Sequence, residues 1–165
     1  MAVSVVVAVG DEIADAMVKQ LAPMVRALKV GAYDEEGVEM GPVITKQSQE
    51  NILNYIEEGI TQGATLVLDG RDHAKNEGFY VGGCIFDQVS DQMSIYTDEI
   101  FGPVLSIVRV STYDEALTLV NDHEYGNGTC IFTRDGEAAR YFSDHIQVGM
   151  VGINVPLPVP VAYHS

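Results

Sequence analysis

The sequence predicts an α/β fold in which a parallel sheet is wrapped by helices. Short apolar runs rich in β-branched residues alternate with helical patterns, as in the strand 104–110, the helix 112–121 and the strand 129–133. Strand, helix and strand units of this length favour parallel pairing, because the helix carries the chain back to the starting end of the sheet. We expect right-handed crossovers, with ligands bound at the carboxyl ends of the strands.

Composition indicates a single domain and excludes several classes of partner. With 165 residues, of which 47% are hydrophobic, residues 1–165 can bury one substantial core. The net charge of −15 argues against nucleic acid and against an anionic membrane surface, because both need clustered Lys and Arg. Cys84 and Cys130 are the only cysteines, and both lie in apolar runs. This usage favours a reduced, cytoplasmic protein, or the matrix of a mitochondrion in a eukaryote.

The N-terminal third predicts a strand, a helix and a loop. Residues 1–9 are apolar but too short for a membrane span and lack the basic start of a signal peptide, so we expect a buried strand. The strand begins at the initiator methionine, which predicts that the chain starts inside a longer one. An apolar helical face follows, and Pro23 should kink or divide that helix. Residues 30–41 are acidic and aperiodic, typical of an exposed loop. The face comprises Ile13, Met17, Leu21, Met24 and Leu28.

The middle of the chain predicts a second helix and two further strands. Thr45 can cap this helix, and Gly63 lies beyond its end. Strands are expected at 65–68 and 79–86, with a loop over 87–97. The predicted inner face of the helix consists of Ile52, Ile56 and Ile60.

The C-terminal third repeats the alternation more regularly. Thr112 to Glu115 form a capping box that starts a helix ending at Asn121. A strand at 129–133, a helix at 136–145 and a strand at 150–154 follow. The proline-rich tail, residues 155–165, should be extended and cannot be a central strand.

The best candidate for a ligand contact is the segment 97–104. Glu99 and Phe101 stand immediately before Gly102-Pro103, and we expect Gly102 to take a backbone angle closed to other residues. In one interpretation the Glu99 carboxylate accepts hydrogen bonds from a diol, and the Phe101 ring packs against the same ligand. In the other, Glu99 is a solvated turn acid and Phe101 is buried in the core. Local sequence alone favours the second interpretation.

A complete active site cannot be recognised in the sequence. It contains no catalytic triad order, metal-ligand spacing, G-x-G-x-x-G or P-loop. Both cysteines lack a basic neighbour, so we interpret them as inert thiols. Asp72, His73 and Glu77 could bind a metal but lie at no recognised spacing, and we expect a surface loop there. None of the histidines qualifies as a general base; they are His73, His123, His145 and His164.

Several motifs together resemble the aldehyde dehydrogenase superfamily, in order and spacing across the whole chain. The later motifs are Glu99-Ile100-Phe101-Gly102-Pro103-Val104, Asn121 before Tyr125-Gly126, Phe132-Thr133, and Gly149-Met150-Val151-Gly152-Ile153-Asn154. Earlier agreement comes from Met40-Gly41-Pro42-Val43-Ile44 and Gly78-Phe79-Tyr80-Val81. The segments 125–129 and 154–160 resemble the methylmalonate-semialdehyde dehydrogenase branch.

This resemblance implies a fold and a function. The fold would be the three-layer catalytic domain, with helices on both faces of a mainly parallel sheet. The activity would be NAD-dependent oxidation of a small semialdehyde through a cysteine thiohemiacetal, with coenzyme A as acyl acceptor in that branch. Glu99 would hold the nicotinamide ribose hydroxyls, and Phe101 would pack beside that ribose. The parent enzyme would be a homo-oligomer.

The chain also departs from the family pattern. The family nucleophile would precede residue 1, and the cofactor-binding domain and oligomerisation arm also lie outside the 165 residues. We therefore expect no catalytic residue and no metal site in this chain, weak NAD binding, and no activity by the chain alone. The alternative is a stand-alone, non-catalytic interaction module derived from the same fold. A reading frame ending at Ser165 and starting at Met1 would favour that alternative.

Overall fold

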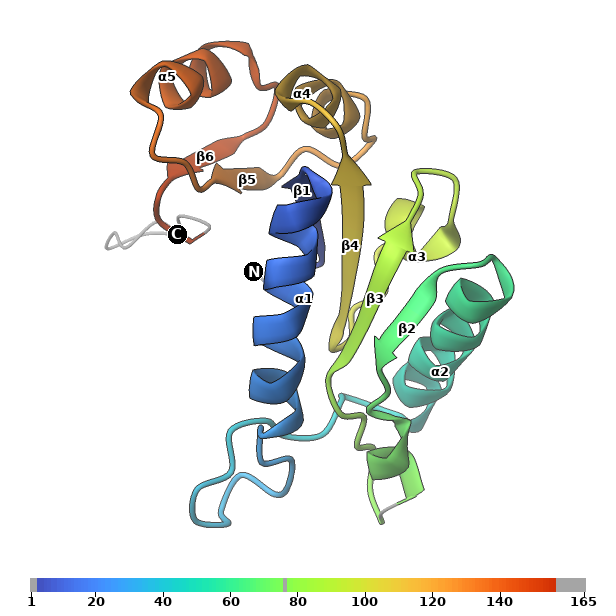
Figure 1. Cartoon of the computed structure of the whole chain (residues 1–165). Helices are drawn as coiled ribbons and strands as arrows, with labels where there is room; N and C mark the ends of the chain where they lie inside the picture. Colours follow the sequence, from blue (N-terminus) through green and yellow to red (C-terminus); the bar gives the residue numbers. More distant parts are fainter. Residues whose placement is uncertain (1–2, 76, 157–165) are drawn as a thin grey trace. The chain divides into compact units, whose positions relative to one another are not determined.

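The computed structural model describes residues 3–75 and 77–156 (Figure 1). It divides the chain into two compact units. We call residues 4–111 the four-stranded unit, and residues 112–156 together with Val3 the two-stranded unit. That the chain forms a single domain stays a prediction. Across the described residues, no helix combines the length and the apolar character that crossing a membrane requires.

The four-stranded unit is built on a mixed, mainly parallel sheet. Its strands are β1 (Val5–Val9), β2 (Thr65–Leu68), β3 (Cys84–Val89) and β4 (Val104–Val110). Their order is β1-β4-β3-β2, and β4 pairs in parallel with both β1 and β3. The predicted parallel sheet is thus confirmed for three strands. β2 runs antiparallel to β3, because no helical crossover connects them and the chain returns along the sheet edge.

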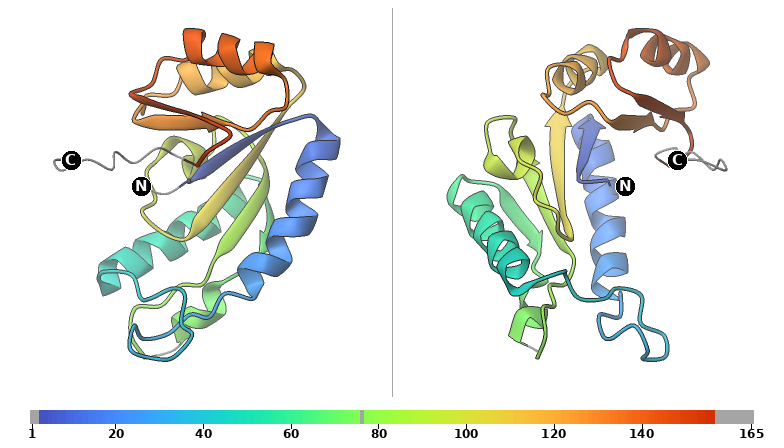
Figure 2. Two further views of the ribbon diagram at one scale, coloured as in Figure 1. Left: turned by 90° about the vertical axis from the view of Figure 1, so that its left-hand side faces the viewer. Right: turned by 180° about the vertical axis from the view of Figure 1, so that it is seen from behind.

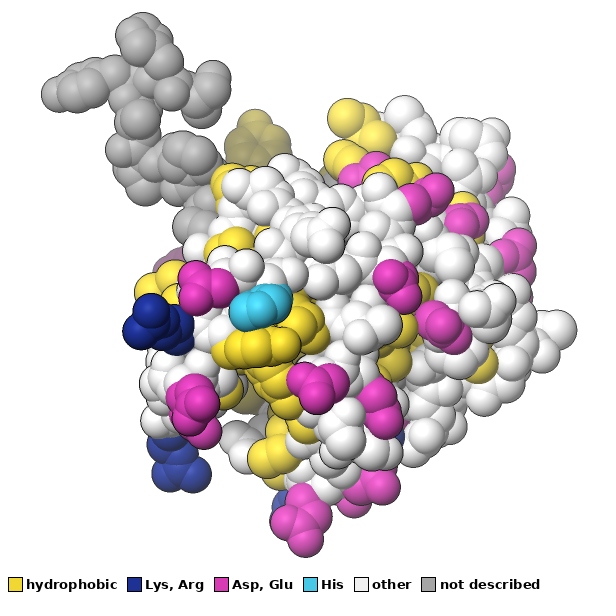
Figure 3. Space-filling model, turned by 90° about the horizontal axis from the view of Figure 1, so that it is seen from above, with side chains coloured by type: hydrophobic (Ala, Val, Ile, Leu, Met, Phe, Trp, Pro, Cys, Tyr) yellow, Lys and Arg dark blue, Asp and Glu magenta, His cyan; other side chains and the backbone are white. Residues whose placement is uncertain are grey.

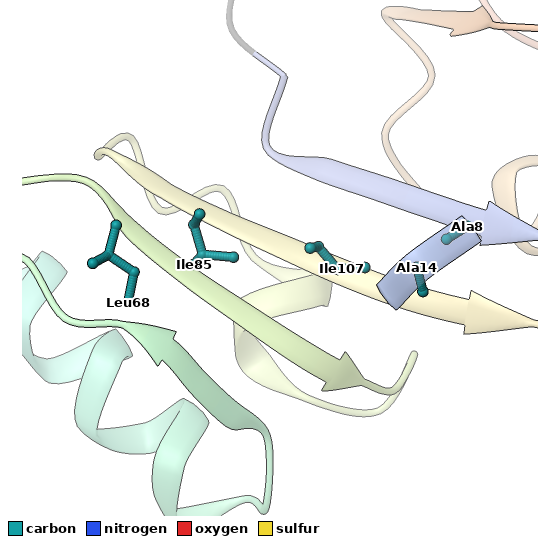
Figure 4. Packing of buried hydrophobic residues seen from close by; sticks show 5 residues of the cluster. All are labelled: Ala8, Ala14, Leu68, Ile85 and Ile107. Carbon is teal, nitrogen blue, oxygen red and sulfur yellow. The ribbon is translucent and has the colours of Figure 1, made fainter. Parts of the chain in front are cut away.

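Helices cover both faces of this sheet, as the two views of Figure 2 show. α1 (Asp11–Arg26) packs on one face, where Ala14 meets Ala8, Leu68, Ile85 and Ile107 (Figure 4). α2 (Lys46–Thr61) lies on the other, where Gly59 approaches the ring of Phe86. Neighbouring strand residues point to opposite faces of a sheet, so Ile85 packs on the α1 side and Phe86 on the α2 side. The expected three-layer arrangement is therefore present.

Two details of α1 differ from expectation. The helix is continuous from Asp11 to Arg26, with Pro23 inside it, so the predicted division is wrong, and the kink given as the alternative stays a prediction. The predicted face is also rotated, because Ile13 is 55% exposed and Met24 is 66% exposed. The small residue Ala14 is buried instead, which lets the helix lie close to the sheet. The residues that pack beside it are Val18, Leu21, Ala22 and Val25.

In α2 the predicted cap is confirmed, whereas the prediction that Ile60 faces inward is wrong. The Thr45 hydroxyl accepts a hydrogen bond from the backbone N–H of Ser48 at 3.1 Å. Ile52 and Ile56 are buried, but Ile60 is 38% exposed. Gly59 takes its place at the buried face because Ile95 leaves no room for a side chain there.

β3 begins five residues later than predicted, so residues 79–83 are not strand. A Cβ on Gly70 would lie 2.3 Å from the carbonyl carbon of Gly82, and Gly82 N–H donates to Gly70 O. Residues near Gly82 therefore pair with the backbone at Gly70 and do not continue the strand. At its other end the strand extends to Val89 through an irregularity in which Gln88 has a φ of 57°.

Two short elements lie where the sequence predicted only loops. They are the 3₁₀ turn η1 (Arg71–Lys75) and the helix α3 (Ser94–Thr97). Neither is long enough to show a periodic apolar pattern, so sequence periodicity carries no signal for them.

The two-stranded unit matches its predicted elements closely. It contains α4 (Tyr113–Asn121), β5 (Gly128–Ile131), α5 (Gly136–His145) and β6 (Met150–Ile153). β5 and β6 pair in parallel. Thr112 caps α4 as predicted, and the Asp135 carboxylate caps α5 by accepting from the N–H groups of Glu137 and Ala138. Of the predicted extended tail, residues 157–165 lie outside the described residues.

Candidate functional site

The predicted contact segment connects α3 to β4 in the four-stranded unit. Asp98 ends α3, where its N–H donates to Ser94 O at 3.0 Å. The Thr97 hydroxyl donates to one carboxylate oxygen of Asp98 at 2.8 Å. At the far end, the carbonyl oxygen of Pro103 accepts from Cys84 N–H at 2.8 Å. Both ends of the segment are thereby fixed, one by a helix terminus and the other by the sheet.

Between these ends, Glu99 and Phe101 face solvent. The Glu99 side chain is exposed, and no residue within the described ranges bonds to its carboxylate. The Phe101 ring is 83% exposed, so the interpretation of Phe101 as buried in the core is wrong. An unengaged carboxylate and an open aromatic face lie two residues apart. Such a pair can accept hydrogen bonds from a diol and pack against the ring that carries it.

Phe101 is also held in a costly backbone conformation. Its φ is +58°, in the left-handed region that bulky side chains disfavour by about 1–2 kcal/mol. Burial of the ring does not offset this cost, because the ring lies in solvent. Strain of this kind persists where the surrounding structure fixes the backbone, and it gathers at ligand sites.

The role predicted for Gly102 needs correction. Its φ is not positive, since the left-handed residue of the turn is Phe101. Glycine is required at 102 for space: a Cβ there would lie 2.6 Å from Cδ1 of Ile52 on α2. The absence of a side chain lets the turn pack directly on the helix. Ile52 therefore supports the segment, a role invisible in the sequence because fifty positions separate it from Gly102.

Neither cysteine has the surroundings of a nucleophile. Cys84 is buried, and burial raises the pKa of its thiol, although Gly70 N–H donates to the sulfur at 3.2 Å. Burial likewise raises the pKa of the Cys130 thiol. A thiol whose pKa is raised holds little thiolate at neutral pH. Both fit the inert role predicted for them.

The described histidines are dispersed and engaged in local structure. His145 ends α5, where its ring stacks on Tyr141 with centroids 3.9 Å apart and its Nδ1 lies 2.8 Å from Tyr141 O. His123 Nδ1 accepts from Tyr125 N–H at 3.1 Å. His73 belongs to η1, and His164 lies outside the described residues. Within residues 3–75 and 77–156, no three His, Cys, Asp or Glu side chains gather as a metal site would require.

An ion-pair cluster that the sequence did not reveal joins three elements of the four-stranded unit. The Arg109 guanidinium on β4 donates to both oxygens of Asp87 on β3, at 3.0 and 2.7 Å. It also bonds Asp11 and Asp15 of α1, at 3.1 and 2.7 Å. Asp87 is buried, and the hydrogen bonds from Arg109 lower the pKa of its carboxyl. We interpret this cluster as structural, because the guanidinium is saturated by acids of its own chain.

Surface charge agrees with the composition. Figure 3 shows acidic side chains spread among hydrophobic ones over the face seen from above.

A family model described as "Aldehyde dehydrogenase family" matches residues 1–164. The malonate-semialdehyde dehydrogenase of Pseudomonas aeruginosa is 58% identical over 168 residues, covering 100% of this chain and 34% of that protein. Malonate-semialdehyde dehydrogenase 1 of Geobacillus thermodenitrificans is 50% identical over 165 residues, covering 99% of this chain and 34% of the relative. The chain thus spans about a third of the length of these relatives.

Solved structures agree with the sequence matches. A protein of Sinorhizobium meliloti 1021, solved as a complex with NAD, superposes with a TM-score of 0.95 at 54% identity, over 99% of this chain and 34% of that one. The methylmalonate-semialdehyde dehydrogenase of Oceanimonas doudoroffii superposes with a TM-score of 0.94 at 59% identity, over 98% of this chain and 34% of that one. Together with the layers of the fold and the Glu99–Val104 motif, these matches establish that the chain belongs to the aldehyde dehydrogenase family.

Proposed function

We propose that this chain is the part of an NAD-dependent semialdehyde dehydrogenase that holds the nicotinamide ribose through Glu99 and Phe101. The observation that carries the proposal is the solvent-facing Phe101, kept at a φ of +58° beside the unengaged carboxylate of Glu99. Packing does not explain a strained, exposed aromatic residue, whereas a ligand that stacks on it does. The relatives named for malonate and methylmalonate semialdehyde support the substrate class.

Each of the two residues would have a distinct task. The Glu99 carboxylate can accept from two vicinal hydroxyls at once, which fixes the ribose in rotation as well as position. The Phe101 ring would cover one side of that sugar and exclude water from it. NAD, when bound, supplies the acceptor for the hydride that leaves the aldehyde. The residues present fit this group, because the carboxylate and the ring are both open to solvent within one turn.

The chemistry at the aldehyde would need a thiol that this chain does not provide. The family reaction passes through a cysteine thiohemiacetal, but Cys84 is buried and the pKa of each thiol is raised. We therefore propose that the chain alone is inactive, and that the enzyme containing it forms an acyl-coenzyme A product as a homo-oligomer. The free cysteines fit a reducing compartment such as the cytoplasm.

Coenzyme binding tests the proposed site. In the longer polypeptide that contains this chain, Glu99→Gln should raise the KM for NAD at least tenfold, because a charged acceptor shared by two hydroxyls is lost. Glu36→Gln, which changes another exposed acid, in the acidic loop, is the matched control and should leave that KM unchanged. Equal KM values for wild type and Glu99→Gln would remove Glu99 from the site.

A second experiment uses the chain by itself. Mixed with NAD and malonate semialdehyde, it should give no increase in NADH absorbance, and calorimetry should detect no submicromolar NAD binding, which would require roughly −8 kcal/mol. Turnover by the 165-residue chain would contradict the proposed inactivity, and submicromolar binding would show a more complete site.

The second candidate function, a non-catalytic interaction module, is favoured by large exposed apolar side chains. Tyr33 is 95% exposed and Ile44 is 84% exposed, both in the four-stranded unit. Such side chains gather at protein interfaces. Glu99-dependent NADH formation by the longer polypeptide would reject this candidate.

A further inference from the structure

The helix α2 contacts both ends of α3, the short helix that leads into Glu99. At the start of α3, Ser94 N–H donates to the amide oxygen of Gln62 at 2.8 Å, and Ser94 Oγ donates to Glu58 at 2.9 Å. At the end of α3, the Tyr55 hydroxyl donates to the second carboxylate oxygen of Asp98 at 3.0 Å. Residues three and four apart share one helix face, so Tyr55 and Glu58 of α2 and Gln62, which caps its C-terminus, form a single polar row.

An apolar row on the same helix, formed by Ile52 and Gly59, packs against Gly102 and against Ile95 of α3. Cδ1 of Ile95 would lie 2.9 Å from a Cβ on Gly59, and Ile52 meets Gly102 in the same way. Ile52 is 1% exposed and Ile95 is 2% exposed, so this seam is dry. Because packed interiors resist small displacements, α2 acts as a rigid surface against which the segment is set.

Asp98 is the point at which this surface reaches the proposed coenzyme contact. Its carboxylate has one oxygen on Thr97 and the other on Tyr55, and its N–H closes α3. Hydrogen bonds to an ionised acceptor are stronger than neutral ones. These bonds hold the Asp98 side chain in one orientation. Glu99 is the next residue along the chain. The bonds of Asp98 therefore set where the backbone of Glu99 begins.

We propose that Tyr55 is a positioning residue for Glu99 and Phe101, and that its hydroxyl sets the affinity of the site for the ribose of the coenzyme. The inference deepens the proposed function and rests on it. Tyr55 lies 43 positions before Asp98 and does not itself contact the coenzyme in this scheme.

The test is Tyr55→Phe in the longer polypeptide, because this change removes one hydroxyl and keeps the ring. We expect the KM for NAD to rise about threefold to tenfold, as for a lost hydrogen bond to a charged group. The KM for the semialdehyde should stay unchanged, and the melting temperature should fall only by the small amount that one lost, solvent-exposed hydrogen bond gives. Tyr33→Phe, at a residue of the same unit that is 95% exposed, is the matched control and should alter neither the KM for NAD nor the KM for the semialdehyde. Asp98→Asn should reproduce the effect of Tyr55→Phe.

A double mutant separates positioning from mere support of the fold. If Tyr55 acts through Glu99, Tyr55→Phe should raise the KM for NAD less than twofold in a Glu99→Gln background. A full additional increase there, or a drop in melting temperature with an unchanged KM, would overturn the inference while leaving the proposed function intact. If Glu99→Gln itself leaves the KM unchanged, the proposed function fails, and this inference fails with it.

Discussion

The two units of this chain differ sharply in how much they bury. Among the described residues, every buried hydrophobic side chain except Phe142 lies in the four-stranded unit. In the two-stranded unit, β5 is half-buried along its whole length, and α4 has no buried residue. The elements of the two-stranded unit nevertheless match the sequence prediction more closely, since the misplaced start of β3 and the unpredicted η1 and α3 all lie in the four-stranded unit. A recognisable pattern of strand and helix is therefore a poor guide to the stability of a region.

The physical reason lies in the number of layers. The sheet of the four-stranded unit is covered by α1 on one face and α2 on the other, which removes Ile85 and Phe86 from water in two separate cores. A two-stranded sheet has little surface to bury and is marginal in water by itself. We expect hydrogen exchange to show protection lost first in residues 112–156 as denaturant is added.

The largest effect should come from matched truncations of the two buried phenylalanines. Phe86→Ala, at a fully buried site, should cost about 4 kcal/mol and remove protection throughout residues 4–111. Phe142→Ala should remove protection only in residues 112–156, because Phe142 is the single buried hydrophobic described there. Peptide-resolved hydrogen exchange measures both. Loss of protection across both units in Phe142→Ala would contradict the distinction.

A smaller loss is expected from Arg109→Met. The change leaves the buried Asp87 carboxylate without its cation, which costs about 3 kcal/mol. Arg140→Met in the two-stranded unit is the control. Its pair with Asp144 spans 3.9 Å between exposed side chains, and such surface pairs contribute about 0–1 kcal/mol. Urea unfolding followed by circular dichroism compares them, and equal losses would show that the cluster is not structural.

The same cluster predicts an acid sensitivity of the four-stranded unit. The hydrogen bonds from Arg109 hold the pKa of Asp87 below its unfolded value of about 3.9. A lowered carboxyl pKa stabilises the fold above the unfolded pKa, and that contribution is lost as pH falls through the folded pKa. Unfolding free energies measured between about pH 6 and pH 2 should fall less steeply in Asp87→Asn than in wild type. Identical slopes would contradict the assignment.

Next in size is a pair of glycine substitutions, one in each unit. Gly102→Ala would place a Cβ 2.6 Å from Ile52 and should cost about 2 kcal/mol by overpacking the seam with α2. Gly136→Ala, at the first residue of α5, meets nothing within 4 Å and should change stability by no more than about 1 kcal/mol, in the stabilising direction. Thermal melting compares the two variants. A neutral Gly102→Ala would show that the turn can move away from α2.

The smallest effect distinguishes two residues of positive φ. Phe101→Gly should stabilise the four-stranded unit by up to about 1 kcal/mol, because glycine relieves the strain and the exposed ring loses no packing. Asn154→Gly in the two-stranded unit should not stabilise. It removes an amide oxygen that accepts from Thr133 N–H at 2.9 Å. A destabilised Phe101→Gly variant would mean that the ring has a structural role.

From the sequence alone, the alternation of elements, the helix caps at Thr45 and Thr112 and the family could be predicted. Each of these depends on residues that are neighbours along the chain. The inner face of α1 could not be predicted, because a small buried residue such as Ala14 adds little to an apolar pattern. The start of β3 was misplaced because a close approach between Gly70 and Gly82 decides it. The structure places the candidate residues Glu99 and Phe101 in solvent at one turn, and their binding role stays a prediction.

The sequence by itself determined the longer helices, most of the strands and the motif proposed as the candidate site, since these depend on the spacing of residues close together in the chain. Only the tertiary structure decided that Phe101 is strained and exposed, that Gly102 packs on Ile52, and that Tyr55 bonds Asp98. These contacts join positions 43 and 50 residues apart. Their geometry depends on how α2 and α3 pack together, and the pattern of neighbouring residues does not show which distant positions will meet.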